Sequence, residues 1–220
     1  MSLSQEKLKQ NIKNIYEQAG DAEVIAVTKY VDIEAMKSLY NQGVRLFAEN
    51  RAQELLEKQD LLGDLNEEIE WHFIGRLQRR PVKDIINRID YLHSLDRMSL
   101  VKEVDKRAEG IIKCFLQVNI SQEEQKAGFA VEELEEVIQE IADYPNIEII
   151  GLMTMAPYEA EEDELNHIFS SLKNEQEKIA ALNLPYAPCQ ELSMGMSRDY
   201  HLAVAHGATY VRVGSAFFEE

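Results

Sequence analysis

Short apolar runs alternate with helical repeats along most of this chain. Continuous apolar runs of this length are typical of parallel strands that are covered on both faces. After the first run, apolar residues recur at helical spacing at Ile33, Met36, Leu39 and Tyr40, and Gly43 ends the repeat. The pattern predicts eight strands, at residues 24–28, 44–48, 71–74, 91–95, 114–119, 147–153, 190–193 and 210–213.

This alternation predicts an α/β fold with a parallel sheet and right-handed crossovers. A helix ending at Gly20 precedes the first strand, and eight strands favour a closed (β/α)8 barrel of the TIM type. The seventh strand has the weakest signal, because Pro185 and Pro188 precede it closely. An open flavodoxin-like or Rossmann sheet is the alternative, although no GxGxxG motif follows the first strand. We expect residues 1–220 to form one domain, since no linker or low-complexity tract divides them.

The charge balance bears on possible partners. The chain has 220 residues, with 23 basic and 40 acidic side chains and a formal charge of −17. So acidic a protein is not expected to bind nucleic acid or an anionic membrane through general electrostatics. Cys114 and Cys189 belong to no metal-binding cluster, and the chain begins with no secretion signal and has no spanning segment. We therefore expect a cytoplasmic protein without a metal.

Basic side chains gather after the third predicted strand, at Arg76, Arg79, Arg80 and Lys83. They could attract an anionic ligand to this end of the barrel. A solvated start of the following helix is the simpler interpretation.

Barrel enzymes place ligands at the carboxyl ends of their strands, and Lys29 directly follows the first strand. An amine at this position could form a Schiff base with a carbonyl compound. On position alone, a surface lysine in a βα loop is the commoner case.

Small residues follow the seventh and eighth strands, where barrels commonly bind phosphate. Ser197 is a plausible N-cap for a helix with Asp199 in its first turn. Gly214 would let the backbone approach an anion, and Ser215 offers a hydroxyl and an N–H group. Each segment alone fits a simple helix cap or turn. For the two together, on adjacent strands, a phosphate site and a purely structural role both remain open.

Two polar residues lie inside predicted strands. Arg212 lies in an apolar strand and must find partners, either a structural carboxylate or a ligand's ring nitrogen or acid group. His72 points either into the barrel or outward, and a hydrogen-bonded core histidine is a commoner case than a proton-transfer group.

Seven segments resemble the pyridoxal phosphate homeostasis proteins, in order along nearly the whole chain. They are AVTKY (26–30), FAENRAQE (47–54), WHFIGRLQ (71–78), VNISQEEQKAG (118–128), GLMTMAP (151–157), LSMGMSRD (192–199) and VRVGSAFF (211–218). The chain departs from the family pattern after Gln78 and in its last residues. The resemblance implies a barrel like the alanine racemase N-terminal domain, the fold-type III barrel that binds pyridoxal 5′-phosphate (PLP).

The resemblance also implies roles for individual residues. Lys29 matches the Schiff-base lysine, Ser197, Gly214 and Ser215 match phosphate-binding positions, Arg212 matches the partner of the pyridine nitrogen, and Asn50 matches a pocket position. An arginine beside the pyridine nitrogen keeps that nitrogen unprotonated and weakens the cofactor as an electron sink.

Three functions fit these features. The first is a non-catalytic PLP carrier, a monomer that buffers the cofactor and delivers it to PLP-dependent apoenzymes. The second is a racemase-like enzyme, which would need a second acid–base group opposite the lysine. In alanine racemases a second domain supplies that group, and here only a resident tyrosine such as Tyr158 could replace it. The third, a Schiff-base aldolase, is not expected to use a lysine on the first strand. The carrier is the favoured interpretation.

Overall fold

Eight parallel strands close into a barrel in the computed structural model, which describes residues 3–123 and 127–220. Each strand pairs with the next one along the chain, and β8 pairs with β1. The strands are β1 (Glu23–Val27), β2 (Leu46–Glu49), β3 (Glu70–Phe73), β4 (Tyr91–Leu95), β5 (Ile112–Gln117), β6 (Ile147–Met153), β7 (Glu191–Met196) and β8 (Tyr210–Val213). The predicted (β/α)8 barrel is therefore confirmed.

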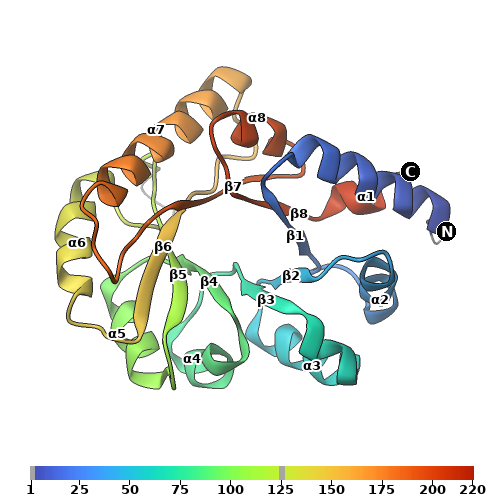
Figure 1. Cartoon of the computed structure of the whole chain (residues 1–220), viewed down its shortest axis with the longest axis horizontal. Helices are drawn as coiled ribbons and strands as arrows, with labels where there is room; N and C mark the ends of the chain where they lie inside the picture. Colours follow the sequence, from blue (N-terminus) through green and yellow to red (C-terminus); the bar gives the residue numbers. More distant parts are fainter. Residues whose placement is uncertain (1–2, 124–126) are drawn as a thin grey trace.

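Helices surround the strands (Figure 1). They are α1 (Gln5–Ala19), α2 (Ile33–Asn41), α3 (Ala52–Leu62), α4 (Arg79–Ile85), α5 (Met98–Arg107), α6 (Leu134–Ile141), α7 (Glu162–Ala180) and α8 (Tyr200–Ala205). Short 3-10 helices are η1 (Gly63–Glu68), η2 (Ile86–Arg88), η3 (Val131–Glu133) and η4 (Ser215–Phe218). In the described part of the chain, no helix combines the length and apolar character needed to cross a bilayer.

The strands bury side chains on both faces, as the continuous apolar runs predict. In β8, Val211 and Val213 join the large outer core beneath the helices. Tyr210 packs instead against the small inner cluster of Phe115, Ile150 and Met153. Because alternate residues face opposite sides of a strand, Arg212 points into the barrel with Tyr210. A charged residue of a nearly apolar strand is therefore placed in the barrel interior.

The N-terminal helix α1 packs beside β1, α8 and the C-terminal η4. Its buried Asn11 donates from Nδ2 to the carbonyl oxygens of Phe217 and Glu219, at 3.0 and 2.8 Å. Both ends of the chain lie beside α1 (Figure 1). The predicted extra helix thus holds the C-terminal segment against the barrel.

Most predicted strand positions are right to within two residues. The bounds of β4, β6 and β8 agree with the prediction, while β2 begins and ends later than expected. β7 continues to Met196, past the predicted end at residue 193. Its extra length comes from irregular pairing with β8, where Met196 lies level with Arg212. Short apolar runs could not reveal this register shift.

Candidate functional site

The carboxyl ends of β1 and β8 bring Lys29 and Gly214 to the same mouth of the barrel. Ala26 pairs with Val213, so Gly214 lies level with Val27 and Lys29 follows two residues later. Ile25 faces the barrel interior level with Arg212, and Lys29 lies in the turn that follows β1. Its side chain is partly exposed, and its Nζ lies 4.9 Å from the centre of the Tyr30 ring. The lysine is therefore accessible at the mouth.

Ser197 links the ends of β7 and β8. Its Oγ accepts hydrogen bonds from the backbone N–H groups of Gly214 and Ala216, at 3.1 and 3.4 Å. A Cβ atom at Gly214 would lie 3.2 Å from the carbonyl oxygen of Val27, which is a crowded contact. Ser215 is exposed as the first residue of η4. All three predicted phosphate-site residues thus lie at or beside the loop that follows β8.

The predicted capping role of Ser197 is wrong. Helix α8 begins at Tyr200, and Asp199 is its N-cap residue. The Asp199 side chain also stabilises the turn between β7 and α8, because its Oδ1 accepts the N–H of Met196 at 2.6 Å. Gly195, at φ 96°, makes this turn possible, and a Cβ there would lie 2.7 Å from that of Ala203. The Ser197 hydroxyl is therefore directed to the neighbouring loop.

Arg212 lies in the barrel interior with 3% of its surface exposed. Its Nη1 donates to Ser193 Oγ at 2.5 Å, and its Nη2 donates to the Thr154 carbonyl oxygen at 3.0 Å. Burial lowers its pKa to about 10, and the charge of Asp199 opposes this shift. The two hydrogen-bond partners of the guanidinium are thus neutral oxygens, from the segments of β6 and β7. Neither of the two partners considered from the sequence, a bonded carboxylate or a ligand group, is among them, and Asp199 acts on Arg212 only through its charge.

A buried carboxylate, that of Glu49, is hydrogen-bonded to Thr28, and no role for it could be inferred from the sequence. Glu49 accepts from Thr28 Oγ1 at 2.5 Å and from Lys58 Nζ at 2.7 Å, both at its Oε1. Lys58 Nζ also donates to the Thr28 carbonyl oxygen at 2.6 Å. Burial raises the pKa of Glu49, and the bonds from Lys58 and Thr28 oppose the rise. This group fixes the residue that immediately precedes Lys29.

Asn50 lies at the end of β2, where it contacts the segment after β3. A Cβ at Gly75 would lie only 1.9 Å from the Asn50 carbonyl oxygen, so this position requires glycine. The structure therefore places Asn50 at the mouth, two strands away from Gly214 and three from Ser197.

The basic cluster after β3 is partly neutralised. Arg76 Nε lies 3.8 Å from Asp96, and Arg79 Nη2 lies 3.9 Å from Glu103. Helix α4 begins at Arg79, so the cluster lies at the start of a helix, which is the simpler of the two interpretations of the sequence.

His72 points into the barrel, where it is a hydrogen-bonded core residue as expected. Its ring stacks on Tyr91 with centres 4.5 Å apart, and its Nδ1 lies 2.7 Å from Nε2 of His93. Burial lowers the pKa of His72, and it lowers the pKa of His93 further with help from the charges of His72 and Arg212. Sequence reasoning overlooked His93. The signal was present, because two neighbouring strands each carry a histidine at an inward-facing position.

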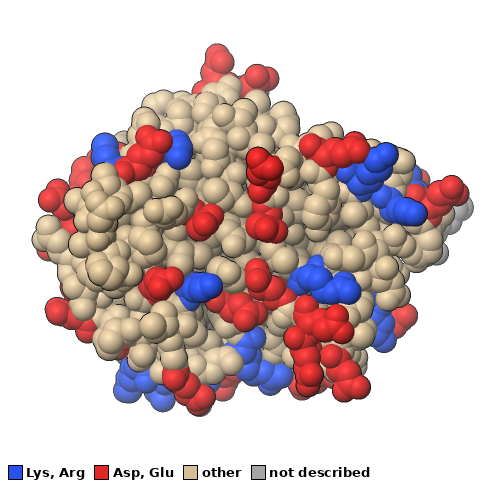
Figure 2. Space-filling model, in the orientation of Figure 1, with Lys and Arg blue, Asp and Glu red and all other residues tan. Residues whose placement is uncertain are grey.

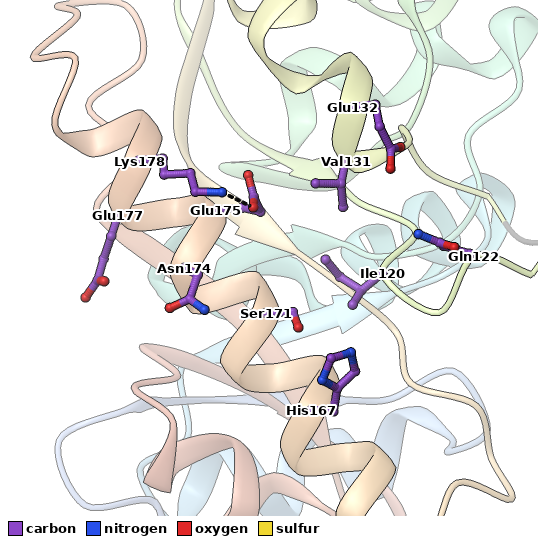
Figure 3. A pocket seen from close by; sticks show the side chains of 10 residues that line it. All are labelled: Ile120, Gln122, Val131, Glu132, His167, Ser171, Asn174, Glu175, Glu177 and Lys178. Atoms are coloured by element: carbon purple, nitrogen blue, oxygen red, sulfur yellow. Dashed lines mark hydrogen bonds and ion pairs between the residues drawn. The ribbon is translucent and has the colours of Figure 1, made fainter.

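A surface groove of about 530 Å³ lies elsewhere, between α7 and the segments around Ile120 and Val131 (Figure 3). His167, Ser171 and Asn174 line its α7 side, and Lys178 is bound to Glu175 there. The six predicted site residues are absent from its lining, so the groove is separate from the mouth.

The charges of the surface agree with the composition. Figure 2 shows acidic side chains scattered over the visible face, with basic ones between them and wide neutral areas. Across residues 3–123 and 127–220, no group of three or more histidine, cysteine or acidic residues is arranged to hold a metal ion. In the family-like segment 118–128, positions 124–126 lie outside the described residues.

Known proteins resemble this chain over almost its whole length. The family model of the alanine racemase N-terminal domain matches residues 3–220. A pyridoxal phosphate homeostasis protein of Aquifex aeolicus is 36% identical, with 96% of this chain and 94% of the relative covered. Its human counterpart is 36% identical over 90% of this chain and 76% of its own length.

Solved structures show the same fold. PipY of Synechococcus elongatus, solved with PLP bound, is 31% identical, with a TM-score of 0.89 and coverage of 96% of this chain and 100% of PipY. The alanine racemase of Corynebacterium glutamicum shares the fold at 17% identity and a TM-score of 0.77, with 100% of this chain and 62% of the racemase covered. The chain therefore belongs to the alanine racemase N-terminal domain family, among the relatives named pyridoxal phosphate homeostasis protein.

Proposed function

We propose that this protein binds pyridoxal 5′-phosphate at the barrel mouth, through a Schiff base to Lys29. The observation that carries the proposal is the convergence of Lys29, Arg212 and the Ser197–Gly214 loop at one end of the barrel. The PLP-bound state of PipY, which matches this chain over 96% of its length, supports the ligand. When bound, PLP would supply an aldehyde, and the Lys29 amine would form the Schiff base with it while the aldehyde oxygen leaves as water.

The residues present fit this cofactor. The group has an aldehyde, a phosphate and a pyridine nitrogen, and the mouth offers an amine, a glycine loop and a guanidinium. Gly214 leaves room beside Val27 that a side chain would fill, since its Cβ would lie 3.2 Å from the Val27 oxygen. The N–H groups of Gly214 and Ala216 already converge on one oxygen, that of Ser197. A phosphate oxygen can accept from the same kind of convergent donors.

Arg212 would donate to the pyridine nitrogen. A guanidinium donates and cannot accept, so it holds that nitrogen in its unprotonated form. Burial strengthens this preference by placing the interaction in a medium of low dielectric constant. Glu49 and Lys58 would hold the Thr28–Lys29 segment in place, and Asn50 would border the pocket.

The proposed role is that of a carrier without robust catalysis. An unprotonated pyridine nitrogen makes the cofactor a weak electron sink, which disfavours carbanion chemistry. The tyrosine considered as a second acid–base group, Tyr158, is 77% exposed. The guanidinium of Arg198 lies over its ring at 4.4 Å, so the pair forms part of the outer rim. The relatives are named for homeostasis, which agrees with a carrier.

In this proposal the protein is a cytoplasmic monomer that buffers PLP and hands it to apoenzymes. The free, buried Cys114 and Cys189 fit a reducing compartment.

Loading tests both parts of the proposal. Purified protein is incubated with PLP, freed of excess by gel filtration, and examined for a visible absorption band and for bound phosphate. We expect about one cofactor per chain, and a chain that emerges colourless would refute binding. Loaded protein is then incubated with D- and L-amino acids, and racemisation well above that of free PLP would refute the carrier role in favour of a racemase-like enzyme.

A further inference from the structure

A chain of hydrogen bonds crosses the barrel interior from Arg212 to the opposite end. Arg212 Nη1 lies 2.5 Å from Ser193 Oγ, and Ser193 Oγ lies 2.7 Å from His93 Nδ1. His93 Nε2 lies 2.7 Å from His72 Nδ1, and His72 Nε2 lies 2.8 Å from Glu70 Oε1. Glu70 begins β3, so this carboxylate lies at the amino end of the strands, away from the mouth.

Elementary chemistry sets the direction of every bond in this chain. The Glu70 carboxylate can only accept, so a neutral His72 donates to it from Nε2 and accepts at Nδ1. His93 therefore donates from Nε2 to His72 and accepts at Nδ1 the hydroxyl proton of Ser193. The Ser193 oxygen in turn accepts from Arg212, which can only donate. With both histidines neutral, each proton has one position, and both rings adopt the Nε2–H tautomer.

The surroundings keep both histidines in this state. His93 and His72 are fully buried, and burial disfavours their charged forms. The ring of His93 stacks on Phe115 with centres 4.3 Å apart, and His72 stacks on Tyr91. These contacts hold the rings in the planes that their hydrogen bonds need.

We propose that Ser193, His93 and His72 are positioning residues, which orient the Arg212 guanidinium for the pyridine ring of the cofactor. This inference rests on the proposed function. Ser193 holds one side of the guanidinium, and the Thr154 carbonyl oxygen holds another, so two strands define its plane. Ser193 is held in turn by His93, which lies three strands away across the barrel. The Glu70 carboxylate at the far end aligns the bonds so that each one polarises the next.

The network is tested first without the cofactor. Histidine side chains of the uniformly ¹⁵N-labelled, cofactor-free protein are examined by long-range ¹H–¹⁵N correlation NMR near neutral pH. We expect His93 and His72 to appear as neutral Nε2–H tautomers. A doubly protonated ring or an Nδ1–H tautomer at either residue would overturn the network.

The positioning role is then tested on the cofactor-loaded protein. We expect Ser193→Ala to raise the dissociation constant of PLP roughly tenfold, which corresponds to one lost hydrogen bond to a charged group. It should also shift the visible spectrum or its pH midpoint, because Arg212 is no longer held. Ser193→Thr keeps the hydroxyl and should restore both values. Gln176→Leu is the matched control, since it removes a buried bond from Nε2 to the Cys189 carbonyl oxygen, away from the barrel interior.

Two results separate this inference from the proposed function. If the wild type takes up no PLP, the proposed function fails, and the histidine tautomers still report on the network. If the wild type binds PLP while Ser193→Ala and His93→Gln keep its affinity and spectrum, the positioning role is wrong.

Discussion

Acidification from about pH 7.5 to about pH 5.5 should destabilise the protein through its two interior histidines. Burial lowers the pKa of His72 and His93 in the folded state. In the unfolded chain both return to the ordinary value of about 6.5, so the unfolded state takes up protons that the folded state refuses. The contribution of these two histidines to the free energy of unfolding is therefore present above about pH 6.5 and decreases as the pH falls below that value.

The size of the loss follows from this linkage. Over those two pH units the protonated fraction of an unfolded histidine rises from about one tenth to about nine tenths, which costs about 1.4 kcal/mol if the folded histidine stays neutral. His93 should contribute all of this, because the positive charge of Arg212 adds to the effect of burial. His72 should contribute less, since Glu70 favours its charged form. The total loss is expected to lie between about 1.4 and about 2.7 kcal/mol.

The assay is urea unfolding at both pH values, followed by the fluorescence of the buried Trp71. His93→Gln should lose about 1.4 kcal/mol less than the wild type over this interval, although it starts from a lower stability. The exposed His167→Gln is the control and should lose as much as the wild type. Carboxyl groups such as Glu49 titrate in all three proteins, so their contributions cancel in the comparison. Equal losses in the wild type and in His93→Gln would refute the reasoning.

Three further predictions concern the barrel mouth and the contacts of helix α1. Lys58→Met should lower the free energy of unfolding by about 3 kcal/mol in urea, because it leaves the buried Glu49 carboxylate without its countercharge. The double variant with Glu49→Leu should recover part of this loss. A much smaller loss in Lys58→Met would contradict this account. Gly214→Ala should weaken PLP binding in equilibrium dialysis while the protein stays folded, because the new Cβ crowds Val27; unchanged affinity would argue against a phosphate at this loop. Asn11→Ala should lower the melting temperature by several degrees, because the carbonyl oxygens of Phe217 and Glu219 lose their donor, and an unchanged value would show that these bonds of α1 contribute little to stability.

The barrel could be predicted because its strands are short, apolar and separated by clear helical repeats. Lys29 and Gly214 could be located for the same reason, since a strand end is visible in the sequence once the strand is. The partners of Arg212 could not be predicted. They depend on the register between β6, β7 and β8, which is irregular at Met196 and leaves no trace in hydropathy.

Two local errors arise from features that the sequence pattern does not show. Ser197 looks like an N-cap in the sequence, yet Asp199 takes that place because β7 extends further and Gly195 turns the chain. His72 and His93 lie in neighbouring strands, but a histidine within a strand by itself suggests only a core residue. The partners of His93, namely His72 and Ser193, are 21 and 100 positions away, so only the closed barrel brings them together.

The central claim is that Lys29 holds the cofactor, and reduction with borohydride followed by peptide mass mapping tests it most directly. Reduction turns a Schiff base into a stable amine, so the labelled lysine can be identified after digestion. We predict that the label lies on Lys29, that Lys29→Ala carries none, and that Lys37→Ala, a variant on α2, is labelled like the wild type. A label on another lysine of the wild type, or a full label on Lys29→Ala, would contradict the account.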